Sequence, residues 1–183
     1  MKKQNLDSEL KKIVQESSLT INSIVELIPD IEKAIHEIVK CISKKNKIIL
    51  FGNGGSAADA QHIAAEFIGR FKIERKGFPA IALITDSSCI TALSNDYSFD
   101  IIFSRQCESL VQKGDIVIGI STSGKSKNIL NGFKTAKERG AISIGLLGNK
   151  GGKIGKSIDI PIIVNSSSTA RIQDDDFLKI RLS

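Results

Sequence analysis

The sequence predicts a doubly wound, flavodoxin-like α/β protein: a five-stranded parallel sheet with helices on both faces, preceded by a pair of helices. Three observations predict this class. Five short, nearly continuous apolar runs have the length of strands that are buried on both faces. Segments with helical periodicity separate these runs, as a parallel sheet requires. A length of 183 residues suits one domain with a full core and is short for two.

The chain begins with two amphipathic segments. Residues 5–28 place apolar side chains at three- and four-residue spacing, which predicts a long helix. Pro29 is expected to break this helix, and Asp30 to cap the second one. Together they carry more apolar surface than one layer on a sheet can use. We therefore expect a single domain over 1–183, in which 1–45 form a helical extension for oligomerisation.

From Lys47 onward, strand and helix patterns alternate. The expected strands are residues 48–51, 80–84, 115–120, 141–146 and 158–164. The expected helices between and after them are residues 56–69, 87–94, 99–112, 126–139 and 150–156.

Composition narrows the functional classes. The sequence has no apolar run long enough to span a membrane and no signal-peptide core at its start, so we expect a cytoplasmic protein without membrane contact. Cys41, Cys89 and Cys107 are widely spaced, which predicts small core residues and not a disulfide or a thiolate metal site. The net charge of +6 comes from scattered lysines, with one Tyr and no Trp to stack on bases. A small anionic ligand therefore fits better than nucleic acid.

The stretch from Lys47 to Arg70 contains the first candidate site. An apolar strand runs into a turn with three glycines, and Ser56 then opens a helix. Unpaired backbone N–H groups and the positive end of the helix dipole make such a turn a ready anion site. On the same helix, His62 and Glu66 are four residues apart and share a face, where they could bind a metal or transfer protons. His36, the other histidine, lies beside an apolar helical face without a ligand partner and is interpreted as structural.

A second loop follows the third strand and offers four hydroxyl groups, from Ser121, Thr122, Ser123 and Ser126. In a sheet of order 2-1-3-4-5 the first and third strands are neighbours at the switch point, where ligands bind. The two loops would therefore face each other and form a phosphate site built from neutral donors and helix N-termini. Nucleotide sites fit less well, because neither loop matches G-x-x-x-x-G-K-[ST] and Ala57 stands at the last glycine of G-x-G-x-x-G.

These residues resemble the sugar isomerase (SIS) domain family and, within it, the phosphoheptose isomerases, which act on sedoheptulose 7-phosphate. The resemblance covers most of the chain. Its specific parts are residues 51–62, Ala65-Glu66-Phe67 with Arg70, Ser94-Asn95-Asp96, Ser121-Thr122-Ser123-Gly124 with Ser126, and Thr169-Ala170-Arg171-Ile172-Gln173. The two loops alone would indicate a general sugar-phosphate SIS domain. His62, Glu66 and the closing Arg-Ile-Gln narrow the resemblance to the heptose branch.

The resemblance implies a site and an assembly. The phosphate would be held by Ser56, Ser121, Ser123 and Ser126, with Thr122 alongside. The remaining substrate-binding residues would be Asn53, Gly54, Gly55, Glu66, Arg70, Asn95, Asp96 and Gln173. His62, Glu66 and Gln173 would bind one Zn²⁺ per subunit, and Glu66 would also transfer the proton. The implied partners are a phosphorylated seven-carbon sugar and three further copies of the chain, because family members are homotetramers with a central bundle of N-terminal helices.

The end of the sequence departs from the family. Relatives carry a second histidine eight residues past the glutamine, as metal ligand and acid/base partner, and Arg181 stands there in this chain. Three interpretations stay open: a truncated or frameshifted enzyme, a site with an altered ligand set, or a relative without turnover. Lys125, where many relatives have Asn, is a smaller departure that could strengthen phosphate binding or face solvent.

Two functions therefore compete. The first is an aldose–ketose isomerase that converts sedoheptulose 7-phosphate to D-glycero-D-manno-heptose 7-phosphate for activated-heptose synthesis, and thus for lipopolysaccharide or capsule. This chemistry needs a base beside the carbonyl and stabilisation of an enediol, which a carboxylate and a metal supply. The second is a non-catalytic SIS module that binds a phosphosugar or a protein partner through the same pocket.

Overall fold

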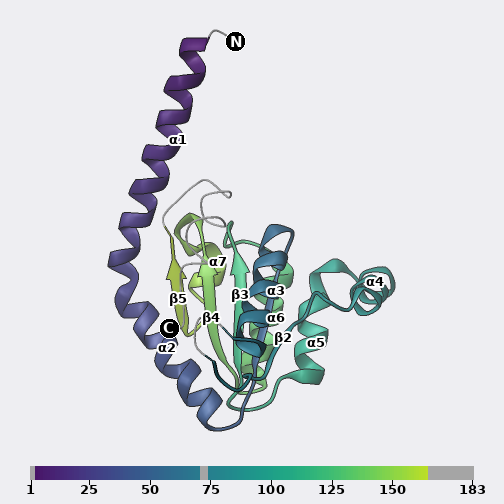
Figure 1. Ribbon diagram of the computed structural model, residues 1–183. Coiled ribbons are helices and arrows are strands. Elements are labelled where there is room, and N and C mark those ends of the chain that lie inside the picture. The colour runs from purple at the N-terminus through teal and green to yellow at the C-terminus, as the bar shows by residue number, and fades with distance from the viewer. Residues whose placement is uncertain (1–2, 71–73, 165–183) are drawn as a thin grey trace.

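A five-stranded parallel sheet forms the centre of the protein, in the order β2-β1-β3-β4-β5 (Figure 1). The computed structural model describes residues 3–70 and 74–164. The strands are β1 (Ile48–Gly52), β2 (Ala80–Ala82), β3 (Ile116–Ser121), β4 (Ile142–Leu147) and β5 (Ile160–Ile163). The predicted fold class and strand order are confirmed. Strand β2 is shorter than predicted because the chain turns at Thr85, whose N–H and hydroxyl both donate to the carbonyl of Ala82.

Helices cover both faces of the sheet. Their bounds are α1 (Lys3–Ser23), α2 (Ile28–Ser43), α3 (Gly55–Ile68), α4 (Ser87–Asp96), α5 (Ile102–Leu110), α6 (Lys127–Glu138) and α7 (Gly152–Gly155). Short 3-10 turns are η1 (Ile24–Leu27), η2 (Phe99–Ile101) and η3 (Asn149–Gly151). Helices α2 and α3 pack on one face of the sheet, and α5, α6 and α7 pack on the other (Figure 1).

Successive residues of β1 point into two different cores. Ile48 and Leu50 belong to the core under α2 and α3, whereas Ile49 and Phe51 belong to the core under α5 and α6. All four are fully buried, which explains why this strand reads as an uninterrupted apolar run. The ring of Phe51 stacks on that of Phe103, with 4.9 Å between centroids. This contact anchors the end of β1, where the first loop of the candidate site begins.

The two N-terminal helices join without a break at Pro29, which corrects the prediction. The first α-helix ends earlier, at Ser23, the 3-10 turn η1 follows it, and Pro29 lies in the first turn of α2. A proline fits there because the first N–H groups of a helix have no intrahelical partner. Asp30 is not the cap; that position belongs to Leu27, which makes no side-chain capping bond. Helix α1 therefore extends away from the sheet as one long arm (Figure 1).

A buried ion pair joins β1 and β3 at the N-terminal edge of the sheet. Nζ of Lys47 lies 2.6 Å from Oδ2 of Asp115, whose side chain is 1% exposed. The carboxylate also accepts the backbone N–H groups of Lys47 and Gln112 and the amide of Asn46. Burial raises the pKa of Asp115, whereas the hydrogen bonds that its carboxylate accepts lower the pKa. Together the hydrogen bonds outweigh burial, so the pKa is below its usual value.

No helix in the described part of the chain is long and apolar enough to cross a membrane. The prediction of core cysteines is confirmed for Cys41 and Cys107, which are buried free thiols. Burial raises the pKa of Cys107 to about 12, so this thiol stays protonated. Cys89, in the first turn of α4, is only half-buried.

Candidate active site

The two predicted loops are neighbours in space. Strand β1 pairs with β3 along its whole length, and Gly52 lies beside Ile120 near the C-terminal ends of the two strands. The turn before α3 and the turn before α6 therefore leave the same edge of the sheet side by side. Their adjacency at the switch point, inferred from the assumed strand order, is confirmed.

The first turn is tight because the backbone of β1 approaches the start of α3. A Cβ atom on Gly52 would lie 2.3 Å from the carbonyl oxygen of Ser56, so only glycine fits. Gly54 has φ +57° and ψ −123°, a conformation that side chains disfavour, and it occupies the N-cap position of α3. As a glycine it offers no capping side chain. Ser56 is 4% exposed at the base of this turn, whereas Gly54 and Gly55 are exposed.

The second turn is held from behind by the segment that follows β4. The carbonyl of Gly124 accepts the N–H of Ile154 at 3.2 Å, and the carbonyl of Ser121 accepts the N–H of Gly148 at 3.2 Å. Gly124 has φ +63°, and a Cβ atom there would lie 2.5 Å from the backbone of Gly151. These contacts leave the second turn little freedom to move.

The serine hydroxyls of the second turn are not used to cap α6. Ser126 is the N-cap residue but makes no side-chain capping bond; its Oγ lies 3.4 Å from Oγ of Ser121. Ser123 is exposed, and its Oγ accepts the backbone N–H of Lys125 at 3.2 Å. Thr122 is half-buried, and the side chain of Lys125 is exposed. The first turn of α6 and its hydroxyls thus form a donor-rich surface that suits an oxyanion.

His62 and Glu66 lie on one face of α3, two turns after the first loop. Nε2 of His62 is 3.7 Å from Oε1 of Glu66, and the side chains are 57% and 37% exposed. This is the geometry expected from their four-residue spacing. Both side chains are accessible to a ligand or a metal ion. Gln173, the third expected metal ligand, lies outside the described residues, as do Arg171 and Arg181.

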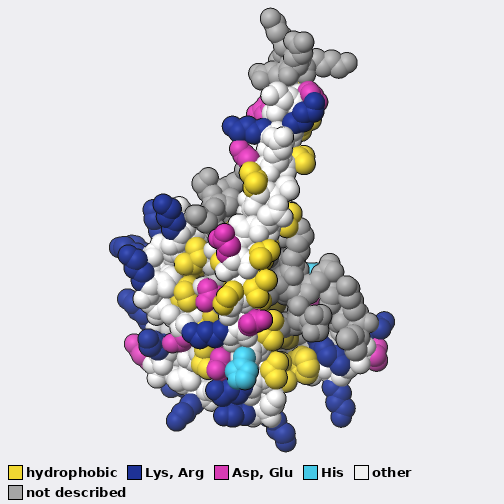
Figure 2. All heavy atoms as spheres, turned by 90° about the vertical axis from the view of Figure 1, so that its left-hand side faces the viewer, with side chains coloured by type: hydrophobic (Ala, Val, Ile, Leu, Met, Phe, Trp, Pro, Cys, Tyr) yellow, Lys and Arg dark blue, Asp and Glu magenta, His cyan; other side chains and the backbone are white. Residues whose placement is uncertain are grey.

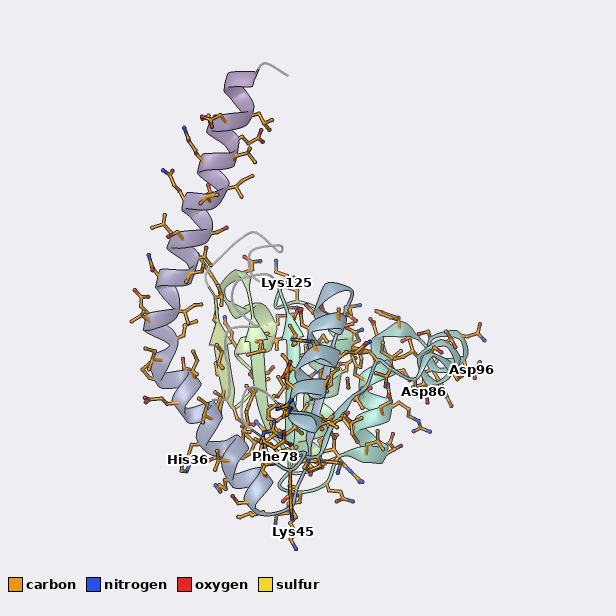
Figure 3. All side chains as sticks on the ribbon, in the orientation of Figure 1. His36, Lys45, Phe78, Asp86, Asp96 and Lys125 are labelled. Atoms are coloured by element: carbon orange, nitrogen blue, oxygen red, sulfur yellow. The ribbon has the colours of Figure 1, made fainter. Side chains whose placement is uncertain are left out.

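Other predicted substrate-binding residues are not gathered at the two loops. Arg70 follows the end of α3, is exposed, and pairs with Glu74 at 3.2 Å. Asn95 and Asp96 are exposed at the end of α4, where Nδ2 of Asn95 donates to Oδ1 of Asp96 at 3.0 Å. Asp96 lies far from Lys125 of the second loop (Figure 3). Helix α4, which ends with these two residues, projects from the body on the side opposite α2 (Figure 1).

Sequence reasoning missed Asn128, in the first turn of α6. Its side chain is 2% exposed and makes two hydrogen bonds with Asn53 of the first loop. The four-residue spacing of small and polar residues on α6 could have indicated this buried position. Asn128, Gly132 and Ala136 form a buried stripe on α6, and a polar residue at such a position needs a buried partner.

Comparisons with known proteins show the family to which the chain belongs. The SIS domain family matches residues 13–148. A phosphoheptose isomerase of Aliarcobacter butzleri is 51% identical over 156 residues, which are 85% of this chain and 82% of that protein. A phosphoheptose isomerase of Nitratiruptor is 57% identical over 136 residues, covering 74% of this chain and 73% of that protein.

Two solved structures with the same fold are also phosphoheptose isomerases. The phosphoheptose isomerase of Neisseria gonorrhoeae is 39% identical, with a TM-score of 0.89 over 96% of this chain and 94% of that chain. The enzyme of Francisella tularensis is 35% identical, with a TM-score of 0.85 over 94% of each chain. On its sequence and its fold, the chain belongs to the phosphoheptose isomerase family of SIS domain proteins.

Proposed function

We propose that this protein is an aldose–ketose isomerase that converts sedoheptulose 7-phosphate to D-glycero-D-manno-heptose 7-phosphate, in the synthesis of activated heptose for lipopolysaccharide or capsule. The observation that carries the proposal is the pairing of two serine- and glycine-rich turns at one sheet edge with His62 and Glu66 on the helix that leaves the first turn. The substrate is a phosphorylated seven-carbon sugar. Because a charged phosphate does not cross a bilayer unaided, the proposed location is the cytoplasm.

The phosphate would bind between the starts of α3 and α6. The first N–H groups of a helix are available as anion donors, and the dipoles of α3 and α6 favour negative charge at their N-termini. The hydroxyls of Ser56, Ser121, Ser123 and Ser126 would add hydrogen bonds, with Thr122 alongside. These groups orient the substrate without taking part in proton transfer.

Glu66 would move the proton. Aldose–ketose conversion removes a proton from the carbon beside the carbonyl while the carbonyl oxygen gains one, which gives an enediol. A proton then returns to the former carbonyl carbon while the other hydroxyl loses its proton to form the new carbonyl. A carboxylate within reach of both carbons can do both steps, because the proton it accepts is the proton it later donates. Oε1 of Glu66 lies 3.7 Å from Nε2 of His62, so both groups can reach the same ligand.

Zinc is the proposed cofactor, one per subunit, with His62, Glu66 and Gln173 as protein ligands. An imidazole nitrogen and a carboxylate oxygen 3.7 Å apart are close to the separation of roughly 3.4 Å between two ligands of a tetrahedral zinc ion. Within the described residues, no three His, Cys, Asp or Glu side chains cluster closely enough to hold a metal. Bound zinc would supply positive charge near the sugar oxygens on which negative charge develops.

The activity is tested by incubating the purified protein with zinc and sedoheptulose 7-phosphate and following the aldose product by NMR. Metal content of the purified wild type and of His62→Ala, measured by mass spectrometry, tests the zinc site independently of turnover. We expect near one zinc per chain in the wild type and a large loss in the variant. Product formation by a zinc-free preparation would refute the cofactor and leave the activity standing.

A second function is favoured by one observation on the sequence. Arg181 stands where the resemblance leads us to expect a second histidine. Losing one acid/base partner commonly lowers the rate by about 10²–10⁴-fold. The alternative is a SIS module that binds a phosphosugar or a protein partner without converting a substrate. If this alternative holds, the unfolding temperature rises with added sedoheptulose 7-phosphate while NMR shows no aldose.

We further propose a homotetramer built through the N-terminal helices. Large apolar side chains are exposed along α1, in η1 and at the start of α2 (Figure 2): Leu6, Leu10, Ile13, Val14, Val25 and Ile28. Such a continuous apolar stripe on an arm that leaves the body is typical of a helix that packs on other helices. Light scattering should give four times the chain mass of 19.8 kDa. The substitution Val14→Asp should reduce that mass, and an unchanged tetramer would place the interface elsewhere.

A further inference from the structure

Two side-chain amides connect the loops of the candidate site. Nδ2 of Asn53 donates to Oδ1 of Asn128, and Nδ2 of Asn128 donates to Oδ1 of Asn53, both at 2.9 Å. The pair joins positions 75 residues apart in the sequence. Asn128 is 2% exposed, whereas Asn53 is half-buried. A ligand can therefore reach Asn53 but not Asn128.

A backbone group determines how both amides are oriented. The N–H of Ile129 donates to Oδ1 of Asn128 at 2.9 Å. Because a backbone N–H can only donate, the atom it meets must be the amide oxygen, and the other end of Asn128 must be the nitrogen. That nitrogen needs an acceptor, which Oδ1 of Asn53 supplies. A flipped Asn53 would place oxygen against oxygen and N–H against N–H, and both bonds would be lost.

The pairing leaves part of the Asn53 amide for a ligand. It uses one of the two N–H groups and one of the two lone pairs of Oδ1. The second N–H and the second lone pair point in directions that Asn128 sets. A polyhydroxylated sugar, whose hydroxyls both donate and accept, is a suitable partner for such a fixed donor and acceptor.

We propose that Asn128 is a positioning residue, which holds the amide of Asn53 in the single orientation that recognises the sugar. The inference rests on the proposed function, because Asn53 meets a sugar only if the two loops bind a heptose phosphate. Asn128 acts through Asn53 and not on the phosphate. Sugar recognition and phosphate binding should therefore respond differently when Asn128 is replaced.

The test compares two ligands on four variants. Calorimetry measures the affinity for inorganic phosphate and for an equilibrated mixture of the two heptose 7-phosphates. The variants are Asn128→Leu, Asn53→Ala, their combination and Asn131→Leu. Leucine has the same number and branching of side-chain heavy atoms as asparagine, and it removes both bonds to Asn53. We expect Asn128→Leu to weaken heptose phosphate binding roughly five- to twentyfold, because Asn53 must then be ordered by the ligand itself. Its affinity for inorganic phosphate should stay within about twofold of the wild type.

Asn131→Leu is the matched control. Asn131 lies on the same helix, and its Nδ2 donates to the carbonyl of Asp100 at 3.0 Å, away from both loops. Removing this bond should lower the unfolding temperature without changing either affinity. The combined variant supplies a second criterion. If Asn128 acts through Asn53, adding Asn128→Leu to Asn53→Ala should weaken heptose phosphate binding no further.

The outcomes separate this inference from the proposed activity. Equal weakening of both ligands by Asn128→Leu, no weakening of either, or an additive effect on top of Asn53→Ala would each overturn the positioning role. A wild-type protein that binds the heptose phosphates but forms no product by NMR would refute the isomerase activity alone. Absence of heptose phosphate binding by the wild type would refute both.

Discussion

Nε2 of His62 lies 3.7 Å from Oε1 of Glu66 on an accessible face of α3, the helix that begins at the first glycine-rich turn. The relationship follows from one helical turn between the two residues and needs no long-range contact. It places a proton-transfer group and a nitrogen ligand on the element whose N-terminus would hold the phosphate. Binding and chemistry can therefore be separated by substitution.

Replacing Glu66 by Gln should abolish turnover while substrate binding persists. Glutamine keeps the shape of the side chain but cannot accept a proton at neutral pH. We expect kcat to fall by at least about 10²–10⁴-fold and the heptose phosphate Kd to change by less than about threefold. Product NMR and calorimetry measure the two quantities. Glu37→Gln, which removes an ion pair with Lys40 on α2, serves as control and should leave kcat unchanged. Undiminished turnover in Glu66→Gln would remove Glu66 from its role.

Removing two hydroxyls from the second loop should act mainly on KM. Ser121→Ala combined with Ser123→Ala deletes two hydrogen-bond donors to the phosphate. Because the charge of the phosphate is the same throughout the reaction, these bonds stabilise the bound substrate and the transition state equally. Since a hydrogen bond to a charged group contributes roughly 1.5–3 kcal/mol, we expect KM to rise by at least tenfold and kcat to fall less. Steady-state kinetics measures both constants. The combination Ser104→Ala and Ser109→Ala on α5 is the control. A fall in kcat with constant KM would place the phosphate elsewhere.

Gly124→Ala should damage both stability and phosphate binding. The residue has φ +63°, and the new Cβ would lie 2.5 Å from the backbone of Gly151, so the second turn must move. Left-handed strain and the clash together should cost about 2–4 kcal/mol. Urea unfolding measures the loss, and calorimetry should show at least tenfold weaker binding of inorganic phosphate. Gly140→Ala is the control: its φ is +81°, but the nearest contact is the flexible side chain of Lys113 at 3.2 Å. It should lose stability only, and the same affinity loss there would contradict the argument.

Acid should remove the contribution of Asp115 to stability. Its pKa is lowered in the folded protein, so the contribution is complete above the unfolded aspartate pKa of about 3.9 and is lost as pH falls through the folded value. Asp115→Asn should be less stable than the wild type by roughly 2–4 kcal/mol at pH 7, because Lys47 loses its buried partner. The two proteins should converge as the pH falls below the folded pKa of Asp115.

Urea unfolding at a series of pH values measures this difference. Asp7→Asn on α1 is the control, because Asp7 is 68% exposed and its pair with Lys11 is solvated. It should give a constant and small difference from the wild type. A gap between wild type and Asp115→Asn that stays constant from pH 7 to pH 3 would show that the carboxylate's charge is not what stabilises the fold.

The sequence by itself determined the alternation of strands and helices and, on the assumption of a flavodoxin-like strand order, the neighbouring positions of the two loops. These features follow from local periodicity and from the rules that govern parallel sheets, so the turns before α3 and α6 could be paired in advance. His62 and Glu66 were predictable for the same reason, because one helical turn sets their spacing.

Only the tertiary structure decided which distant side chains meet. Asn128 finds Asn53 across 75 residues, and no local pattern specifies a partner at that distance. Asn95 and Asp96 are the last residues of α4, which projects from the body (Figure 1). The packing of α4 against η2 and α5, and not its sequence alone, sets the direction of this helix. Periodicity indicates which face of a helix or strand is buried. Which groups that face contacts depends on the tertiary packing of the whole chain.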